Sequence, residues 1–161
     1  MERLDQKNGN PSDANQYLTF TICQEEYGAE ILRVQEVTGY TTITPIPNAP
    51  AHVRGVMNLR GTIIPVIDLR RRLGLPPVEY NRLNAIVVVN AGAKVRGLLV
   101  DVVTDVRTFS QSSIARPPDF SNDGESPYIT GLAKEGDKVI LLLDLDEILG
   151  VKEGPVLASN H

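Results

Sequence analysis

The sequence predicts a mainly β protein made of two similar units that lie side by side as small β-barrels. Three observations predict this fold: the chain repeats itself, its apolar segments are short and rich in β-branched residues, and glycines and prolines separate those segments. Of the 161 residues, 42% are apolar and 22% are charged, which is the composition of a globular protein able to bury a core.

The repeat is visible in two overlays without gaps. Residues 17–37 match residues 86–106 after a shift of 69 positions, and residues 55–74 match residues 131–150 after a shift of 76 positions. The extra residues of the second copy fall in a proline-containing loop, where insertions cost little. The chain is therefore expected to be a duplicated unit of about 70 residues.

The strands follow from local patterns. Residues 17–23 alternate between apolar and polar, and residues 84–90 form an apolar run rich in valine. Residues 29–37 also fit a helical stripe, but their copy, residues 97–106, is dense in β-branched side chains. Both segments are therefore predicted to be strands.

Connections and turns complete each unit. Three prolines in residues 45–50 exclude regular ladder pairing there. The segments "DLRRRLG" and "DLDEILG" each predict one short helical turn, with Asp68 and Asp144 as N-caps. Gly55, Gly61 and Gly131 are expected at structural turns.

The predicted organisation is one domain, residues 16–150, between a flexible N-terminal tail, residues 1–15, and a C-terminal tail, residues 151–161. Within the domain, the first barrel is expected to take about residues 24–80. The second barrel is expected to take about residues 16–23 together with residues 81–150.

Composition narrows the function. A net charge of −4 argues against nucleic-acid binding by counterion release, and aromatic residues make up only 5% of the chain. No segment approaches the ~20 apolar residues of a membrane span, and the polar N-terminus lacks the apolar part of a signal peptide. The expected protein is soluble and cytoplasmic. Its single cysteine, Cys23, excludes an internal disulfide and is interpreted as a small hydrophobic residue.

The residues that could carry chemistry form no convincing site. His52 and His161 have no metal-ligand spacing, and the phosphate-binding and nucleophile motifs are absent. Asp101 and Asp105 share a face of a strand, but the repeat does not preserve the pair. We therefore expect no catalysis, metal or cofactor. Two alternatives are an enzyme that uses Asp101/Asp105 or Asp144/Asp146, and a nucleic-acid-binding barrel.

Three segments resemble the CheW family of bacterial chemotaxis coupling proteins: "YGAEILRVQEV", "VRGVMNLRGTIIPVIDLRRRLG" and "YITGLAKEGDKVILLLDLDEIL". The resemblance covers about residues 16–150. It implies two pseudo-symmetric, five-stranded SH3-like barrels without catalytic activity. It also implies an adaptor, monomeric in isolation, that couples the cytoplasmic tips of membrane chemoreceptors to the regulatory domain of the histidine kinase CheA. The alternative is a CheA-like system that controls surface motility or another output.

The resemblance also suggests which residues bind. Arg60 lies beside Gly61, and the repeat has Gly136 at the position of Arg60, so an arginine without a counterpart is interpreted as part of a site. Its expected partner is Glu36. The receptor tip, a helical hairpin, is expected to pack into the groove between the barrels. The positions matched to that groove are Leu18, Ile31, Val34 and Val103. With Glu36 and Arg60 they make up the expected receptor-binding residues. Phe120, in a polar loop, is the expected contact for the kinase.

Overall fold

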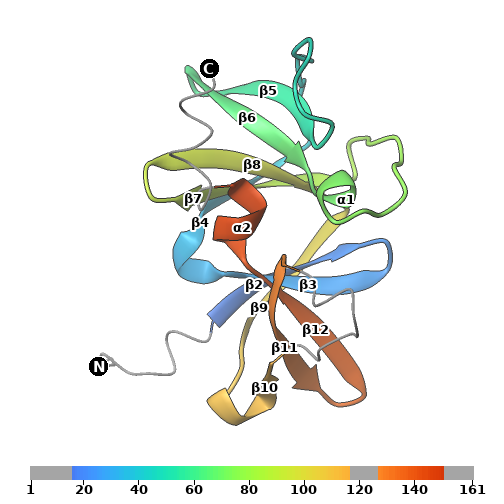
Figure 1. The fold of residues 1–161 in the computed structure, drawn as a ribbon, viewed down its shortest axis with the longest axis vertical. Helices are drawn as coiled ribbons and strands as arrows, with labels where there is room; N and C mark the ends of the chain where they lie inside the picture. Colours follow the sequence, from blue (N-terminus) through green and yellow to red (C-terminus); the bar gives the residue numbers. More distant parts are fainter. Residues whose placement is uncertain (1–15, 117–126, 151–161) are drawn as a thin grey trace.

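A computed structural model describes residues 16–116 and 127–150 of the chain (Figure 1). Its smaller sheet has five strands in the order β4-β7-β8-β6-β5. These strands are β4 (Val34–Gly39), β5 (Val53–Leu59), β6 (Thr62–Asp68), β7 (Ala85–Ala91) and β8 (Lys94–Val100). The short helix α1 (Leu69–Arg72) follows β6 directly.

The larger sheet has six strands in the order β10-β11-β12-β3-β2-β9. These strands are β2 (Gln16–Ile22), β3 (Glu25–Glu30), β9 (Val102–Thr108), β10 (Ile114–Ala115), β11 (Ile129–Glu135) and β12 (Lys138–Leu143). The helix α2 (Leu145–Leu149) follows β12, and the 3-10 turns η2 (Ile31–Arg33) and η3 (Gln111–Ser113) precede β4 and β10. The predicted all-β class with short helical ends is confirmed.

The repeat is confirmed strand by strand. The shift of 69 carries β2 onto β7 and β3 onto β8, and the shift of 76 carries β5 onto β11 and β6 onto β12. Registers correspond as well: Val66 lies opposite Gly97 in one parallel pair, and Leu142 lies opposite Gly28 in the other. The sixth strand, β10, corresponds to the isolated bridge between Thr44 and Val56. The two sheets are thus related by an internal two-fold pseudo-symmetry.

The two copies exchange strands between the sheets. The five-stranded sheet combines β4, β5 and β6 of the first copy with β7 and β8 of the second, and the six-stranded sheet does the reverse. The expected division at residues 23/24 and 80/81 is therefore wrong. It separated β2 from β3, which are joined by a two-residue turn and paired along their length, so both must lie in one sheet.

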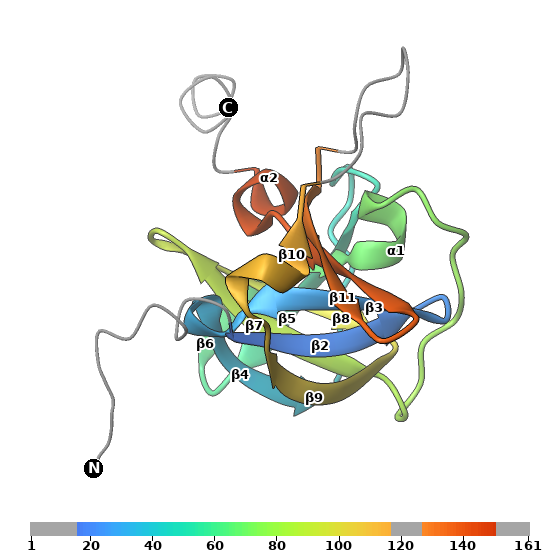
Figure 2. The same cartoon turned by 90° about the horizontal axis from the view of Figure 1, so that it is seen from below.

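The exchange places one apolar cluster between the two sheets, beside a smaller cluster within each sheet. Phe20 of β2, Val87 of β7, Leu98 of β8, and Leu145 and Ile148 of α2 are fully buried in the same apolar cluster. Figure 2 shows both helices on one side of the molecule, with the edge strands β4 and β9 on the other. Burial of β-branched and leucine side chains from both copies explains why the two sheets stay together.

Both predicted helix caps are confirmed. The Asp68 carboxylate accepts a hydrogen bond from the Arg70 N–H at 3.1 Å, and the Asp144 carboxylate accepts one from the Glu147 N–H at 3.1 Å. Gly150 ends α2 with a left-handed φ of 76°. These caps satisfy backbone donors that a helix of four or five residues would otherwise leave unpaired.

The glycine predictions are confirmed only in part. Gly61 lies in the β5–β6 turn with φ 91°, as expected. Gly55 and Gly131 lie inside strands, beside β-bulges, and not in turns. At Gly55 the reason is close approach, because a Cβ atom there would lie 2.2 Å from the Thr44 carbonyl oxygen. Cys23 is also different from its prediction, because it is exposed in the β2–β3 turn.

Candidate functional site

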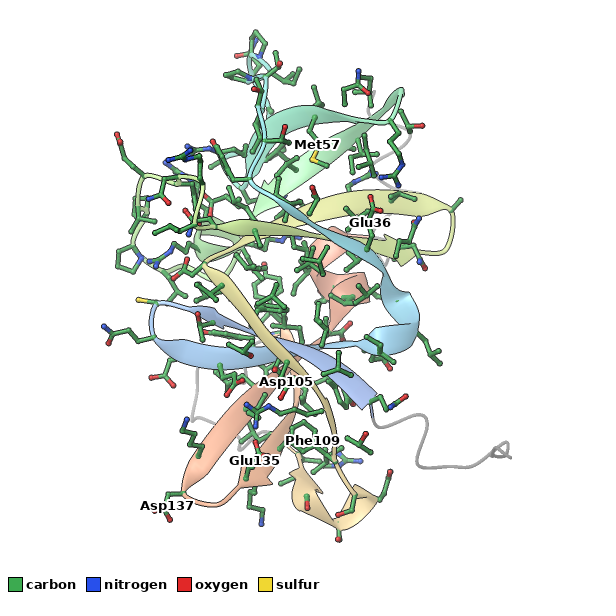
Figure 3. All side chains as sticks on the ribbon, turned by 180° about the vertical axis from the view of Figure 1, so that it is seen from behind. Glu36, Met57, Asp105, Phe109, Glu135 and Asp137 are labelled. Carbon is green, nitrogen blue, oxygen red and sulfur yellow. The ribbon has the colours of Figure 1, made fainter. Side chains whose placement is uncertain are left out.

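The edge strands β4 and β9 cross the face of the molecule opposite the helices (Figure 3). They are counterparts in the repeat: Val34 pairs with Val89 in one sheet, and Val103 pairs with Phe20 in the other. A bulge follows the same position in both strands. Each is an edge strand of its own sheet, so this face presents one margin of each sheet.

Glu36 and Arg60 form the ion pair that the sequence suggested. The Arg60 Nη2 atom donates to both carboxylate oxygens of Glu36, at 2.9 Å each. Glu36 lies on β4 and Arg60 in the β5–β6 turn, so the pair joins the two edges of the five-stranded sheet. The Arg60 side chain is 73% exposed and that of Glu36 is 28% exposed. Most of the guanidinium therefore faces solvent while its direction is set by Glu36.

The predicted apolar contacts are less accessible than expected. Leu18 is buried in the core, so its side chain contributes packing and no exposed surface. Ile31, Val34 and Val103 are half-buried and pack against the same core. Only part of the surface of each of these three side chains is accessible to a partner.

Sequence reasoning missed the exposed valines of the same strands. Val37 on β4 and Val102 and Val106 on β9 have between 43% and 48% of their surface exposed. Val37 and Val106 are counterparts in the repeat, because Val37 lies opposite Val87 and Val106 lies opposite Leu18. The period-2 alternation of a half-buried strand was the signal that could have identified them.

Phe120, the expected kinase contact, lies outside the described residues. Within residues 16–116 and 127–150, no helix is long and apolar enough to cross a membrane. The same residues contain no group of three side chains placed to hold a metal ion.

A second ionic cluster joins the edge strand β9 of the six-stranded sheet to β11 and β3. Arg107 on β9 pairs with Glu135 at the end of β11 and donates to Glu26 on β3 at 3.2 Å. Thr104 also donates to Glu26, at 2.8 Å. This cluster is less exposed than the Glu36–Arg60 pair, since Arg107 is 27% exposed and Glu26 is 12% exposed. Its contacts fit a role in holding the sheet together.

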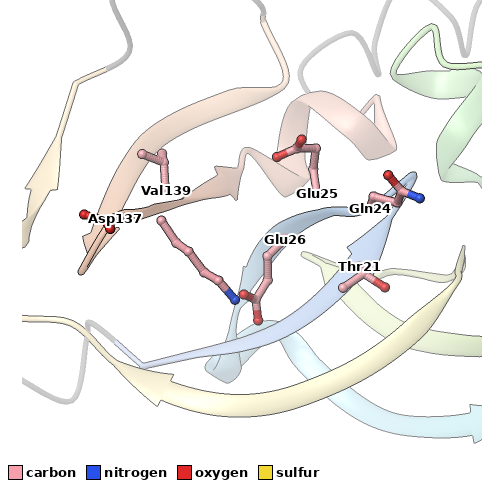
Figure 4. Close-up of a pocket in the computed structure, with 7 residues that line it drawn as sticks. Thr21, Gln24, Glu25, Glu26, Asp137 and Val139 are labelled. Atoms are coloured by element: carbon pink, nitrogen blue, oxygen red, sulfur yellow. The ribbon is translucent and has the colours of Figure 1, made fainter.

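A shallow hollow lies between the β2–β3 and β11–β12 turns (Figure 4). Three carboxylates line it, those of Glu25, Glu26 and Asp137, together with Lys138 and Val139. Glu26 is already engaged by Arg107. The hollow is thus an acidic surface feature between two hairpins, without a nucleophile and base in hydrogen-bond contact.

The carboxylates considered for catalysis serve the structure instead. Asp101 accepts from Arg70 Nη2 at 2.7 Å, and this hydrogen bond raises the pKa of Arg70. Asp105 accepts from the Val106 N–H, and Asp146 pairs with Arg33. Asp101 and Asp105 each interact with a different partner. They therefore do not form the paired carboxylates that general acid–base catalysis would use.

Asp68 forms a further buried contact near α1. It accepts from the Tyr80 hydroxyl at 2.9 Å, while Arg54 and Arg71 lie at 3.9 Å from its other oxygen. Burial and the Asp68 charge raise the pKa of Tyr80, so this hydroxyl remains a donor. The contact fixes the segment between the two copies against the helix cap.

Comparisons with known proteins agree with this architecture. Residues 16–153 match the family model of the CheW-like domain. The chain is 39% identical to a chemotaxis protein CheW of Klebsiella aerogenes, covering 86% of this chain and 83% of that one. It is 36% identical to a chemotaxis protein CheW of Rhizobium meliloti, covering 84% and 88%. The crystal structure of the scaffolding protein TtCheW from Thermoanaerobacter tengcongensis is similar, with a TM-score of 0.77 and 34% identity over 84% of this chain and 92% of that one.

Proposed function

The chain belongs to the CheW-like domain family, and from this premise we propose that it is a non-catalytic scaffold of a chemotaxis system. It couples the cytoplasmic tips of chemoreceptors to the regulatory domain of the histidine kinase CheA. The observation that carries the proposal is the family match across all described residues, with relatives that are themselves named chemotaxis and scaffolding proteins. The protein works in the cytoplasm, at the inner face of the membrane, through its contact with receptors.

The proposed receptor surface is the face formed by β4 and β9. Exposed Val37 and Val106, which lie opposite the core residues Val87 and Leu18, supply apolar anchors on one face. Arg60, paired with Glu36 of β4, supplies a directed charge at the margin of this surface. A helical hairpin presents apolar side chains at intervals of three and four residues, which suits docking along two strand margins. The half-buried Val34 and Val103 widen the apolar strip at its centre.

The first test is calorimetric titration of the protein with a soluble receptor-tip fragment and, separately, with the regulatory domain of the kinase. We expect saturable binding to each. The protein saturated with the kinase domain is then titrated with the receptor fragment, and the fragment should still bind, since separate surfaces are proposed. Failure to bind either partner while the protein is folded by circular dichroism would contradict the proposed function.

Variants locate the receptor surface. Val106→Glu places a charge on an exposed apolar anchor and should weaken receptor binding at least tenfold, the effect of removing a central contact. Arg60→Ala should weaken it by a similar factor. The matched control is Lys134→Ala, which removes one exposed charge from the strand before the β11–β12 turn. If all three variants bind the fragment equally well, the receptor surface lies elsewhere.

A further inference from the structure

The β5–β6 turn holds Arg60 in an unusual backbone conformation. Arg60 has φ 48° and Gly61 has φ 91°, the two positive values of a type I′ hairpin turn. Glycine and asparagine adopt this left-handed region readily, whereas a long side chain is disfavoured there. The second copy has Gly136, with φ 61°, at the position of Arg60. The first copy therefore has an arginine in a left-handed conformation, where the second copy has a glycine, which adopts that conformation without strain.

One side chain contacts the main chain of this turn. The Asn58 side-chain oxygen accepts a hydrogen bond from the Gly61 N–H at 2.7 Å. That N–H belongs to the peptide group that directly follows the Cα atom of Arg60. The bond therefore restricts rotation about ψ of Arg60 and satisfies a donor that an open turn would leave to solvent.

The direction of the Arg60 side chain depends on this backbone. Its guanidinium reaches across the margin of the sheet to Glu36, and both 2.9 Å contacts come from one nitrogen. Asn58 is itself exposed and lies on the edge strand β5, two residues before Arg60, whereas Glu36 lies on the other edge strand, β4. Glu36 thus holds the tip of the arginine side chain, and Asn58 holds its base.

We propose that Asn58 is a positioning residue for Arg60: its side chain fixes the left-handed turn and so presents the guanidinium to the receptor already ordered. This inference rests on the proposed function of the Glu36–Arg60 pair. A long side chain that is already ordered in the free protein loses less conformational entropy on binding, so the affinity is higher. The counterpart of Asn58 in the second copy is Lys134, which precedes a turn without an arginine at its tip.

The test is a double-mutant cycle of Asn58→Ala and Arg60→Ala, with the affinity for a soluble receptor-tip fragment measured by calorimetry. With Arg60 present, Asn58→Ala should weaken binding roughly threefold to tenfold, the factor for one side chain ordered on binding. In the Arg60→Ala background, the same change should alter affinity less than about twofold, because the group it positions is gone. Lys134→Ala, the matched control, should leave the affinity unchanged.

A second readout reports the turn directly. In Asn58→Ala, hydrogen exchange of the Gly61 amide should accelerate several-fold, while the amides of the β11–β12 turn keep their rates. The thermal midpoint, followed by circular dichroism, checks that the variants are folded.

Three outcomes overturn the inference. Equal losses from Asn58→Ala in both backgrounds would mean that Asn58 acts without Arg60. Unchanged binding by Asn58→Ala, with weakened binding by Arg60→Ala, would refute the positioning role and leave the proposed receptor surface intact. If Arg60→Ala itself binds normally, the role of the ion pair in the proposed function is wrong, and the positioning role falls with it.

Discussion

The two sheets close their margins with ion pairs of opposite polarity. In the five-stranded sheet the edge strand β4 carries the carboxylate, Glu36, and the β5–β6 turn carries the cation, Arg60. In the six-stranded sheet the edge strand β9 carries the cation, Arg107, and the end of β11 carries the carboxylate, Glu135. In both copies an ion pair thus links the edge strand to the end of a hairpin, but the positive and negative charges are on opposite strands.

The two connections differ in exposure, so different consequences of breaking them are expected. Arg60 is 73% exposed and has one partner, whereas Arg107 is 27% exposed and contacts two carboxylates. An exposed pair contributes about 0–1 kcal/mol, while the loss of one member of a buried cluster costs more. The exposed pair of the five-stranded sheet is therefore the one we propose as a binding site, and the less exposed cluster of the six-stranded sheet is expected to contribute more to stability.

The helices show the same contrast, and here the largest effect is expected. Arg70 of α1 is 9% exposed and pairs with Asp101, whereas its counterpart Asp146 of α2 is 41% exposed and pairs with Arg33. Arg70→Ala leaves a carboxylate in a partly buried site and should lower the free energy of unfolding by about 2–4 kcal/mol. Asp146→Ala should lower it by about 0–1 kcal/mol. Urea denaturation measures both, and equal losses would remove the contrast between the two helices.

The cluster of the six-stranded sheet should give an intermediate effect. Arg107→Ala leaves Glu26, which is 12% exposed, without its cation and should cost about 1–3 kcal/mol of unfolding free energy. The loss should persist at high salt, because buried charges are poorly screened. Arg107→Lys keeps the positive charge but lacks the guanidinium group that contacts two carboxylates. It should be more stable than Arg107→Ala and less stable than the unmodified protein. A salt-sensitive loss below about 0.5 kcal/mol would place this cluster in the same class as the exposed pair.

The exposed pair should give the smallest effect on stability. In Arg60→Gly the lost ion pair is offset by relief of the left-handed backbone, so the unfolding free energy should change by less than about 0.5 kcal/mol. Arg60→Ala should be less stable than Arg60→Gly by about 0.5–1 kcal/mol, because alanine retains the Cβ atom. Denaturation midpoints of both variants measure this difference. A loss above about 2 kcal/mol in Arg60→Gly would show that the pair holds the five-stranded sheet together.

Much of the molecule was predictable because its determinants are local. β-Branched alternation identified most of the strands, Asp68 and Asp144 identified the starts of the helices, and Gly61 identified a turn. Residues 29–37, predicted to be one strand, are instead divided by the 3-10 turn η2 between β3 and β4. The ion pair of Glu36 and Arg60 was also expected, from the missing counterpart of Arg60 in the repeat and from the family resemblance. The site was predicted less well in its apolar part, where Leu18 is buried and the exposed valines were overlooked.

The sequence by itself determined the duplication, the β class and the position of most strands, because the repeat and the alternation of apolar residues are local features of the chain. Only the tertiary structure decided which strands share a sheet. β3 and β8 each continue through a short connection into the other sheet, and strands of either copy have the same apolar face. The apolar pattern of a strand therefore does not show to which sheet the strand belongs. The choice depends on long-range contacts, such as Leu142 against Gly28, that form only when both copies pack around one core.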